Sequence, residues 1–223
     1  MRWTIVLPLK GGPSAKSRLE AGPELARALA ADTLTAVLAC PVVSRTVVVT
    51  ADPGTAAEAA SAGADVVGES GPGDGLVAAV RDGVAAAGPG PVAVLLGDLP
   101  ALRPEDLTDG LSAVHDTLRD RPAASMAAVP DAAGTGTVLL AARGAADLDP
   151  AFGPGSLVAH VRRGAVRVEI VLPRLRQDVD TPDDLRTALG LGVGRRTAGT
   201  LRANGTGTGG GPRAPGPRVP GLS

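Results

Sequence analysis

Cysteine and aromatic side chains are scarce in this sequence of 223 residues. Cys40 is the only cysteine, tyrosine is absent, and Trp3 and Phe152 are the only tryptophan and phenylalanine. A single cysteine excludes an intrachain disulfide and a zinc site built from several thiolates. The 44% of apolar residues are mainly Ala, Val and Leu, which suits a parallel sheet covered on both faces.

Long apolar runs are missing as well. No stretch reaches the roughly 18 to 20 apolar residues that span a bilayer, and no positively charged leader precedes an apolar segment. We therefore expect a soluble, cytoplasmic protein that does not contact a membrane.

The net charge of −1 conceals an uneven distribution of charge. Residues 195–223 carry five arginines and no acid, so the rest of the chain has 17 basic and 23 acidic side chains, a net charge near −6. Such a body has no general attraction for nucleic acid. Positive charge that binds phosphate must therefore be local.

Short apolar runs alternate with helical patterns through the first 120 residues, which predicts parallel βαβ units in an α/β fold. Gly- and Pro-separated strands after residue 124 predict a mixed edge of the sheet. The expected strands are 3–7, 46–50, 65–67, 92–96, 125–129, 137–141 and 166–171, and the expected helices are 24–39, 55–62, 75–87, 104–118 and 181–189. We expect one domain over residues 1–193 and a disordered Gly-, Pro- and Arg-rich tail over residues 194–223.

A cationic, glycine-containing loop follows the first predicted strand. It runs from Leu7 and Pro8 through Lys10 to Lys16 and Arg18. Ligands of open α/β sheets bind at the carboxyl ends of strands, where these three cations could surround a triphosphate. The loop matches neither the Walker A motif nor G-x-G-x-x-G. An ordinary solvated connection remains the alternative.

Three aspartates are candidate magnesium ligands. Asp98 follows a buried apolar run and Gly97, which permits close approach by a nucleotide, and Asp178 and Asp180 alternate along an extended stretch. Magnesium is commonly held by one or two carboxylates together with substrate phosphates. The alternatives are a turn-stabilising role for Asp98 and helix capping by the late Asp-rich segment, in which Thr181 is the expected N-cap.

Two glycine-rich elements form a candidate site for a compact anion. Residues 134–137 and 152–156 offer hydroxyl groups and backbone N–H groups that suit a carboxylate or phosphate. A helix opening near Ser156 would add a favourable dipole. Two hairpin turns would explain the same composition. His160 could face this pocket, whereas His115 is expected on a helix surface.

In this order and spacing, the motifs resemble the 2-phospho-L-lactate guanylyltransferase family and its actinobacterial branch, which uses phosphoenolpyruvate. The resemblance covers about residues 1–193. The matching segments are Pro8-x-Lys10, Ala15 to Leu19, Gly97 to Pro100, Gly134 to Thr137, Phe152 to Ser156 and Asp178 to Pro182. The family implies a Rossmann-like, GT-A-like nucleotidyltransferase fold, Mg²⁺, GTP and a small phosphorylated acid as substrates, and a role in making the deazaflavin coenzyme F(420). The product would pass to a downstream transferase.

The resemblance also implies roles for single residues. Catalytic roles would fall to Lys16, Arg18 and Asp98, metal binding to Asp98, Asp178 and Asp180, acid binding to Thr137, Gly153 and Ser156, and nucleotide binding to Leu7, Pro8, Lys10, Lys16, Arg18, Gly75 and Gly97. The Gly-Thr-Gly-Thr form favours phosphoenolpyruvate over phospholactate. Val77 departs from the asparagine that relatives often have there, which weakens the expectation of a strict preference for GTP.

Three rival functions remain. A related nucleotidyltransferase could act on a molybdopterin or a sugar phosphate, although the compact anion elements favour a small acceptor. A GT-A glycosyltransferase would use an Asp-x-Asp element, but Asp178-Val179-Asp180 lies late in the chain. A non-catalytic nucleotide-binding module would retain nucleotide without releasing pyrophosphate.

Overall fold

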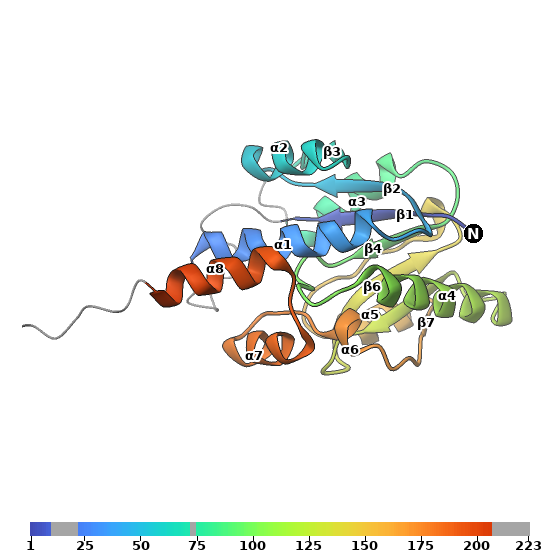
Figure 1. Ribbon diagram of the computed structural model, residues 1–223. Helices are drawn as coiled ribbons and strands as arrows, with labels where there is room; N and C mark the ends of the chain where they lie inside the picture. Colours follow the sequence, from blue (N-terminus) through green and yellow to red (C-terminus); the bar gives the residue numbers. More distant parts are fainter. Residues whose placement is uncertain (10–21, 72–74, 207–223) are drawn as a thin grey trace, which may run out of the picture.

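A seven-stranded sheet forms the centre of the protein (Figure 1). The computed structural model describes residues 1–9, 22–71 and 75–206, with side chains to residue 204. Its strands are β1 (Trp3–Pro8), β2 (Val43–Val49), β3 (Asp65–Val67), β4 (Val92–Leu95), β5 (Met126–Pro130), β6 (Thr137–Ala142) and β7 (Ala165–Arg167). Its helices are α1 (Pro23–Leu38), α2 (Pro53–Ser61), α3 (Leu76–Ala86), α4 (Pro104–Asp120), the short 3₁₀ turn η2 (Ala145–Asp147), α5 (Ser156–Arg162), α6 (Pro173–Arg176), α7 (Pro182–Leu191) and α8 (Arg195–Thr206).

The sheet is parallel in its first half and mixed in its second, as the sequence predicts. The strand order is β3-β2-β1-β4-β6-β5-β7. Strands β3, β2, β1 and β4 run parallel, β6 runs antiparallel to both β4 and β5, and β7 runs parallel to β5. The carboxyl ends of β1 and β4 therefore lie side by side at one edge, which is where ligands of open α/β sheets bind.

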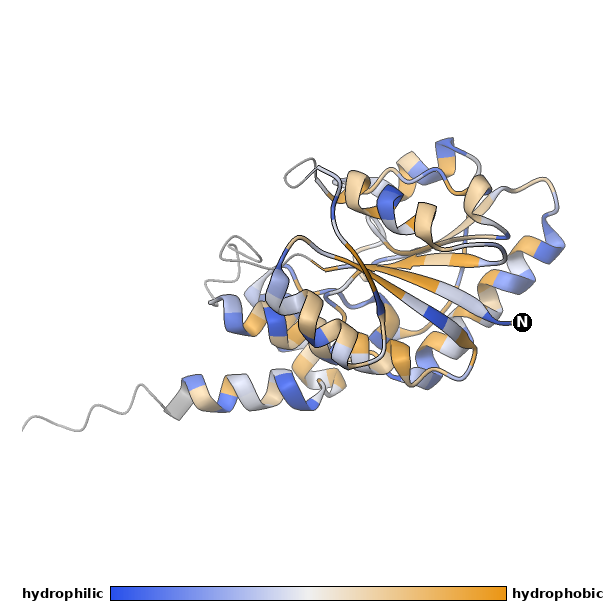
Figure 2. Cartoon of the chain, turned by 90° about the horizontal axis from the view of Figure 1, so that it is seen from above, coloured by the Kyte–Doolittle hydropathy of each residue, from blue (hydrophilic) through white to orange (hydrophobic). Residues whose placement is uncertain are grey.

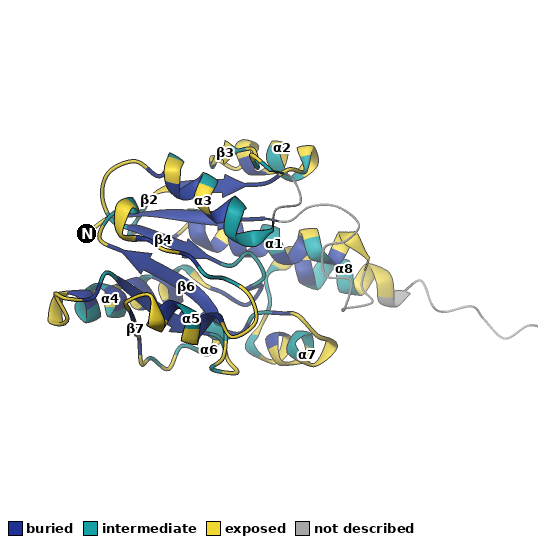
Figure 3. Ribbon diagram, turned by 180° about the vertical axis from the view of Figure 1, so that it is seen from behind, coloured by how far each residue is buried: buried dark blue, intermediate teal, exposed yellow. Residues whose placement is uncertain are grey.

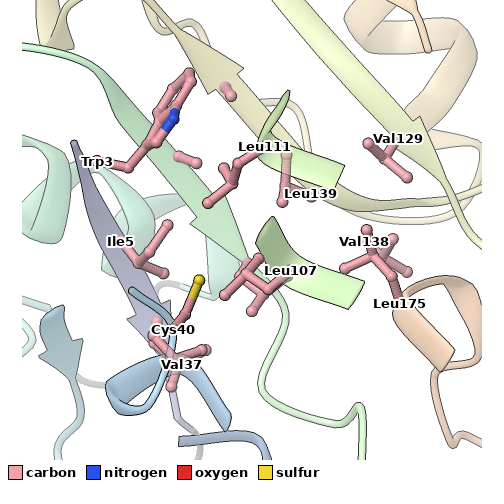
Figure 4. Packing of buried hydrophobic residues seen from close by; sticks show 14 of the residues in the cluster. Trp3, Ile5, Val37, Cys40, Leu107, Leu111, Val129, Val138, Leu139 and Leu175 are labelled. Atoms are coloured by element: carbon pink, nitrogen blue, oxygen red, sulfur yellow. The ribbon is translucent and has the colours of Figure 1, made fainter. Parts of the chain in front are cut away.

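Alternate residues of each central strand enter opposite cores, because successive strand side chains point to opposite faces. Ile5 and Leu7 belong to the core under α1 and α4, whereas Val6 belongs to the core under α3 and α5. Figure 4 shows the first core, where Leu107 and Leu111 of α4 pack close to the strands. The view from behind in Figure 3 shows a buried sheet beneath partly exposed helices, and Figure 2 shows the same strands as the apolar centre. Aliphatic side chains thus supply most of the packing in both cores.

Two predictions of secondary structure are wrong. The seventh strand ends at Arg167 rather than Val171, and Val171 is 90% exposed, so its apolar character did not mark burial. Residues 195–206 form α8, although the sequence predicts disorder from residue 194. Residues 207–223 lie outside the described part of the chain.

Helix α8 is held by a buried carboxylate from another helix. Asp32 of α1 accepts hydrogen bonds from the main-chain N–H groups of Arg196 (3.0 Å) and Thr197 (2.8 Å). These are first-turn donors that have no partner within their own helix. Tertiary capping therefore stabilises a Gly- and Thr-containing helix that has little intrinsic tendency to form. Figure 1 shows α8 lying along α1.

No helix in the described ranges has both the length and the apolar character needed to cross a lipid bilayer.

Candidate active site

Two of the predicted nucleotide-binding residues, Pro8 and Gly97, lie close together where β1 and β4 end. Val6 of β1 pairs with Val94 of β4, so the segments after both strands leave the sheet together. A Cβ atom at Gly97 would clash with Leu9 Cδ2 and would lie 3.2 Å from the carbonyl oxygen of Pro8. The glycine is therefore required by the close approach of two chain segments. This contact places Pro8 beside the loop that carries Asp98.

The Asp98 loop is fixed from two sides. The N–H of Leu99 donates to Thr33 Oγ1 of α1 at 3.0 Å, a buried hydrogen bond. The carbonyl oxygen of Asp98 accepts from the N–H of Val179 at 3.1 Å. The loop that carries the Asp98 carboxylate is therefore hydrogen-bonded to both an early helix and the late acidic segment.

Asp178 lies in an acidic environment that includes Asp98. Burial, followed by the negative charges of Asp98, Asp180 and Asp131, raises the pKa of Asp178 to about 7. The two distant parts of the sequence therefore converge as predicted. Asp180 is exposed, at the start of the turn before α7.

The expected cap of α7 is confirmed. Thr181 Oγ1 accepts from the N–H of Asp184 at 3.2 Å, and the Asp184 carboxylate accepts from the N–H of Thr181 at 2.8 Å. This reciprocal pair is a capping box. Helix capping is thus carried by Asp184, which leaves Asp178 for another role.

The acidic set fits a divalent cation bound jointly with a substrate. Burial and the negative charge of the neighbouring carboxylates raise the pKa of Asp178, and a cation that prefers hard oxygen ligands would relieve the repulsion between these carboxylates. Across residues 1–9, 22–71 and 75–206, no group of three or more His, Cys, Asp or Glu side chains forms a ready-made metal cage. Magnesium does not require one, because it retains water and phosphate ligands.

The Gly-Thr-Gly-Thr turn does not offer the backbone donors that the sequence suggests. The Asp131 carboxylate accepts from the N–H groups of Thr135 (2.9 Å) and Gly136 (2.8 Å), and the Asp131 carbonyl oxygen accepts from Gly134 N–H (3.1 Å). The expectation that these three groups bind an anion is therefore wrong. Their role is to shape the turn that presents Thr137.

Arg176 holds this turn from the side of the late acidic segment. Its guanidinium donates to the carbonyl oxygens of Pro130 (3.1 Å, from Nε) and Asp131 (2.7 Å, from Nη2). Because Arg176 is two residues from Asp178, the same short segment supports both the acidic cluster and the turn.

Thr137 begins β6 and is hydrogen-bonded to a buried histidine. Its Oγ1 lies 2.9 Å from His160 Nδ1, and His160 Nε2 accepts from the main-chain N–H of Ala151 at 2.9 Å. Burial, with a smaller contribution from Arg163, lowers the pKa of His160 to about 4. His160 therefore supports the predicted anion site from behind. His115, expected on a surface, is half-buried on α4.

Gly153 and Ser156 lie in the turn that opens α5. Gly153 has φ 142° and Gly155 has φ 70°, values that favour glycine. Ser156 N–H donates to the Gly153 carbonyl oxygen at 3.0 Å, and Leu157 N–H donates to the Thr135 carbonyl oxygen at 3.2 Å. The second bond joins this turn to the Gly-Thr-Gly-Thr turn, so the two predicted anion elements are neighbours.

Of the remaining candidate nucleotide-binding residues, the structure describes only Gly75 and Leu7. Gly75 caps α3 with φ 89°, and Leu7 is fully buried in β1. Lys10, Lys16 and Arg18 lie outside the described residues.

Sequence reasoning missed three supporting residues: Thr33, Asp131 and Arg176. An aspartate three residues before a glycine is a turn signal that could have revealed Asp131. Thr33 and Arg176 carry no such signal, because their partners are far away in the sequence.

Comparison with known proteins identifies the chain as a nucleotidyltransferase. The model of the MobA-like NTP transferase domain matches residues 15–164. A solved structure from Desulfovibrio desulfuricans G20, assigned to the nucleotide-diphospho-sugar transferases, superposes with a TM-score of 0.63 at 18% identity and covers 92% of this chain and 96% of its own. A nucleotidyl transferase from Methanothermobacter thermautotrophicus gives 0.57 at 20% identity, with 85% and 97% covered.

Much higher identity relates the chain to proteins with one specific name. The phosphoenolpyruvate guanylyltransferase of Streptomyces scabiei (strain 87.22) is 50% identical over 212 residues, which cover 89% of this chain and 95% of the relative. That of Salinispora arenicola (strain CNS-205) is 50% identical over 202 residues, with 88% and 92% covered. The chain belongs to this guanylyltransferase family within the MobA-like NTP transferases.

Proposed function

We propose that this guanylyltransferase joins GMP from GTP to phosphoenolpyruvate and releases pyrophosphate. One observation carries the proposal: the acidic pair Asp98 and Asp178 adjoins the turn that presents Thr137, in a chain half identical to named phosphoenolpyruvate guanylyltransferases. Asp131 links the two parts, because its charge reaches Asp178 and its carboxylate shapes the turn.

A phosphate oxygen of phosphoenolpyruvate attacks the α-phosphorus of GTP, and the bond from that phosphorus to the pyrophosphate breaks. Two anions must approach each other, so alignment and neutralisation of charge contribute more than a strong base. Asp98 with Asp178 or Asp180 would hold Mg²⁺, which neutralises phosphate charge when bound. Thr137, Gly153 and Ser156 hold the acid in line.

The nucleotide lies over the ends of β1 and β4. Pro8 and Gly97, which pack against each other, form the surface beneath it, and Gly75 at the start of α3 contributes main-chain contact. Lys10, Lys16 and Arg18 stabilise the negative charge of the departing pyrophosphate.

The product, enolpyruvoyl-diphospho-guanosine, contains a reactive diphosphate linkage. A downstream transferase in the cytoplasm takes this product in the synthesis of coenzyme F(420).

Pyrophosphate release tests the proposal. Purified protein is mixed with GTP and Mg²⁺ plus phosphoenolpyruvate, 2-phospho-L-lactate, a sugar phosphate or molybdopterin in parallel. We expect turnover with phosphoenolpyruvate, loss of turnover after chelation of the metal, and recovery when Mg²⁺ is returned. Faster turnover with 2-phospho-L-lactate would make that acid, rather than phosphoenolpyruvate, the acceptor substrate. Turnover with neither small acid would exclude the proposed function. Replacing GTP with ATP or CTP measures the effect of Val77.

A further inference from the structure

His160 connects the two turns that flank the proposed acid site. Its Nδ1 contacts the Thr137 hydroxyl at 2.9 Å, and its Nε2 accepts the N–H of Ala151, two residues before Gly153. The ring is fully buried, and Phe152 packs edge-on against it with ring centroids 4.9 Å apart. One side chain thus fixes both turns.

The hydrogen bonds define the tautomer of this imidazole. A main-chain N–H can only donate, so Nε2 must accept and carries no proton. The neutral ring then has its proton on Nδ1 and donates it to Thr137 Oγ1. The lowered pKa agrees with a neutral ring at ordinary pH.

This tautomer determines what the threonine can do. A hydroxyl group that accepts from His160 still has its own proton to donate, and that proton points away from the ring. A donor held in this way is matched to a carboxylate or phosphate oxygen, with which a charge-assisted hydrogen bond forms.

We propose that His160 is a positioning residue for the acid substrate: it orients the Thr137 hydroxyl as a donor to the anionic group and anchors the Gly153 turn at Ala151. The inference rests on the proposed function, because the acid that Thr137 contacts is the acceptor of that reaction. His160 itself touches no reacting atom.

The tautomer can be measured without any substrate. The chain has two histidines, so ¹⁵N-histidine labelling gives two sets of ring signals, and His115→Gln assigns them. We expect His160 to show a protonated Nδ1 and an unprotonated Nε2 from about pH 5 to 8. A protonated Nε2 in this range would overturn the inference.

Two substitutions separate the two hydrogen bonds of His160. His160→Asn places an amide N–H near the former Nδ1 and retains the donor to Thr137. His160→Gln places an amide oxygen near the former Nε2 and retains the acceptor for Ala151, but leaves Thr137 free to rotate. Matched His115→Asn and His115→Gln variants control for the exchange of a histidine elsewhere.

We expect His160→Gln to raise the KM for phosphoenolpyruvate about tenfold, with the KM for GTP and kcat nearly unchanged. His160→Asn keeps the donor to Thr137 and loses the bond to Ala151, so it should raise this KM by a smaller factor, about threefold. Thr137→Val should match His160→Gln without further loss in the double variant. Equal kcat loss in both His160 variants, or a raised KM for GTP, would indicate a structural role only and overturn the inference.

Wild-type turnover separates this inference from the proposed function. If the wild type does not use phosphoenolpyruvate, the proposed function fails and the inference fails with it. If the wild type turns over and Thr137→Val has an unchanged KM for the acid, only the inference fails. Thr137→Val also replaces His160→Gln as the decisive variant should the latter not fold.

Discussion

The main-chain N–H of Val179 donates a 3.1 Å hydrogen bond to the carbonyl oxygen of Asp98, joining the loop after β4 to the segment before α7. This bond sets the distance between two acidic stretches that lie far apart in the sequence. Burial, followed by the charge of the neighbouring Asp98, raises the pKa of Asp178. This backbone contact thus joins the two stretches that carry the proposed metal ligands.

Neutralising either carboxylate should abolish most activity. We expect Asp98→Asn and Asp178→Asn each to lower the rate of pyrophosphate release by about 10²-fold or more, because charge stabilisation at the phosphates is lost. Both should keep the wild-type circular dichroism spectrum. Asp109→Asn, an exposed change on α4, is the matched control. Asp98→Asn activity within twofold of wild type would remove Asp98 from the mechanism.

Gly97→Ala should weaken the binding of GTP. The added methyl group clashes with Leu9 and crowds Pro8, which pushes the β1 and β4 ends apart. We expect a higher KM for GTP and a loss of about 1–3 kcal/mol in unfolding free energy. Gly68→Ala is the control, since its Cβ would meet no atom within 4 Å. Equal kinetics for both variants would show that close approach at Gly97 is not needed.

Asp131→Ala should weaken the binding of the acid substrate and leave the binding of the nucleotide unchanged. The substitution leaves the N–H groups of Thr135 and Gly136 without their carboxylate partner and loosens the turn before Thr137. We expect the KM for phosphoenolpyruvate to rise severalfold and stability to fall by about 1–3 kcal/mol. Steady-state kinetics with each substrate varied, alongside urea unfolding, measures both effects. An unchanged KM for the acid would separate this turn from the acid site.

Asp32→Ala should release α8. Removing the carboxylate that accepts from Arg196 and Thr197 should cost about 1–2 kcal/mol, the usual cost of losing a helix cap. Urea unfolding gives the energy, and limited proteolysis should cut residues 195–206 faster. Glu24→Ala, exposed on the first turn of α1, should change stability by only a few tenths of a kcal/mol. Unaltered proteolysis of α8 would contradict this account.

The buried His160 should make stability depend on pH. Its pKa is about 4 in the folded protein against an ordinary 6.5, so between these values the unfolded chain binds a proton that the folded chain does not. The stability contribution is complete above pH 6.5 and is lost as pH falls toward 4, by on the order of 3 kcal/mol. Asp149 and Arg163 are the charged groups that act on the ring.

Comparison with His160→Asn isolates this pH effect, because asparagine does not titrate. The stability difference between wild type and variant should shrink or change sign as the pH falls from 6.5 to 4. His115→Asn should follow the wild-type curve. A constant difference across this range would show that His160 is not buried as a neutral ring.

Apolar patterns predicted most of the architecture, because strand and helix periods are local properties of the chain. Val92 to Leu96 was expected as a central strand, and β4 spans Val92–Leu95. The exposed Val171 shows the limit of such patterns, since β-branched residues favour strands only where a neighbouring strand is available.

The candidate site, like the fold, was only partly predictable from the sequence. Glycine beside an aspartate after an apolar run, and alternating late aspartates, indicated Asp98 and the pair Asp178 and Asp180 as candidate metal ligands, without a choice within the pair. The composition of the Gly-Thr-Gly-Thr turn suggested free main-chain N–H donors. In the structure, the Asp131 carboxylate accepts the N–H groups of Thr135 and Gly136.

The sequence by itself determined the α/β class, the guanylyltransferase resemblance and the residues able to carry charge or a hydroxyl group. Side-chain chemistry and local periodicity follow directly from the order of the amino acids. Only the tertiary structure decided which donors are already occupied, that Arg176 and His160 hold the turns proposed to bind the acid, and that Asp32 caps α8. Those outcomes depend on contacts between segments far apart in the chain, and such contacts form only when the sheet and its helices pack together.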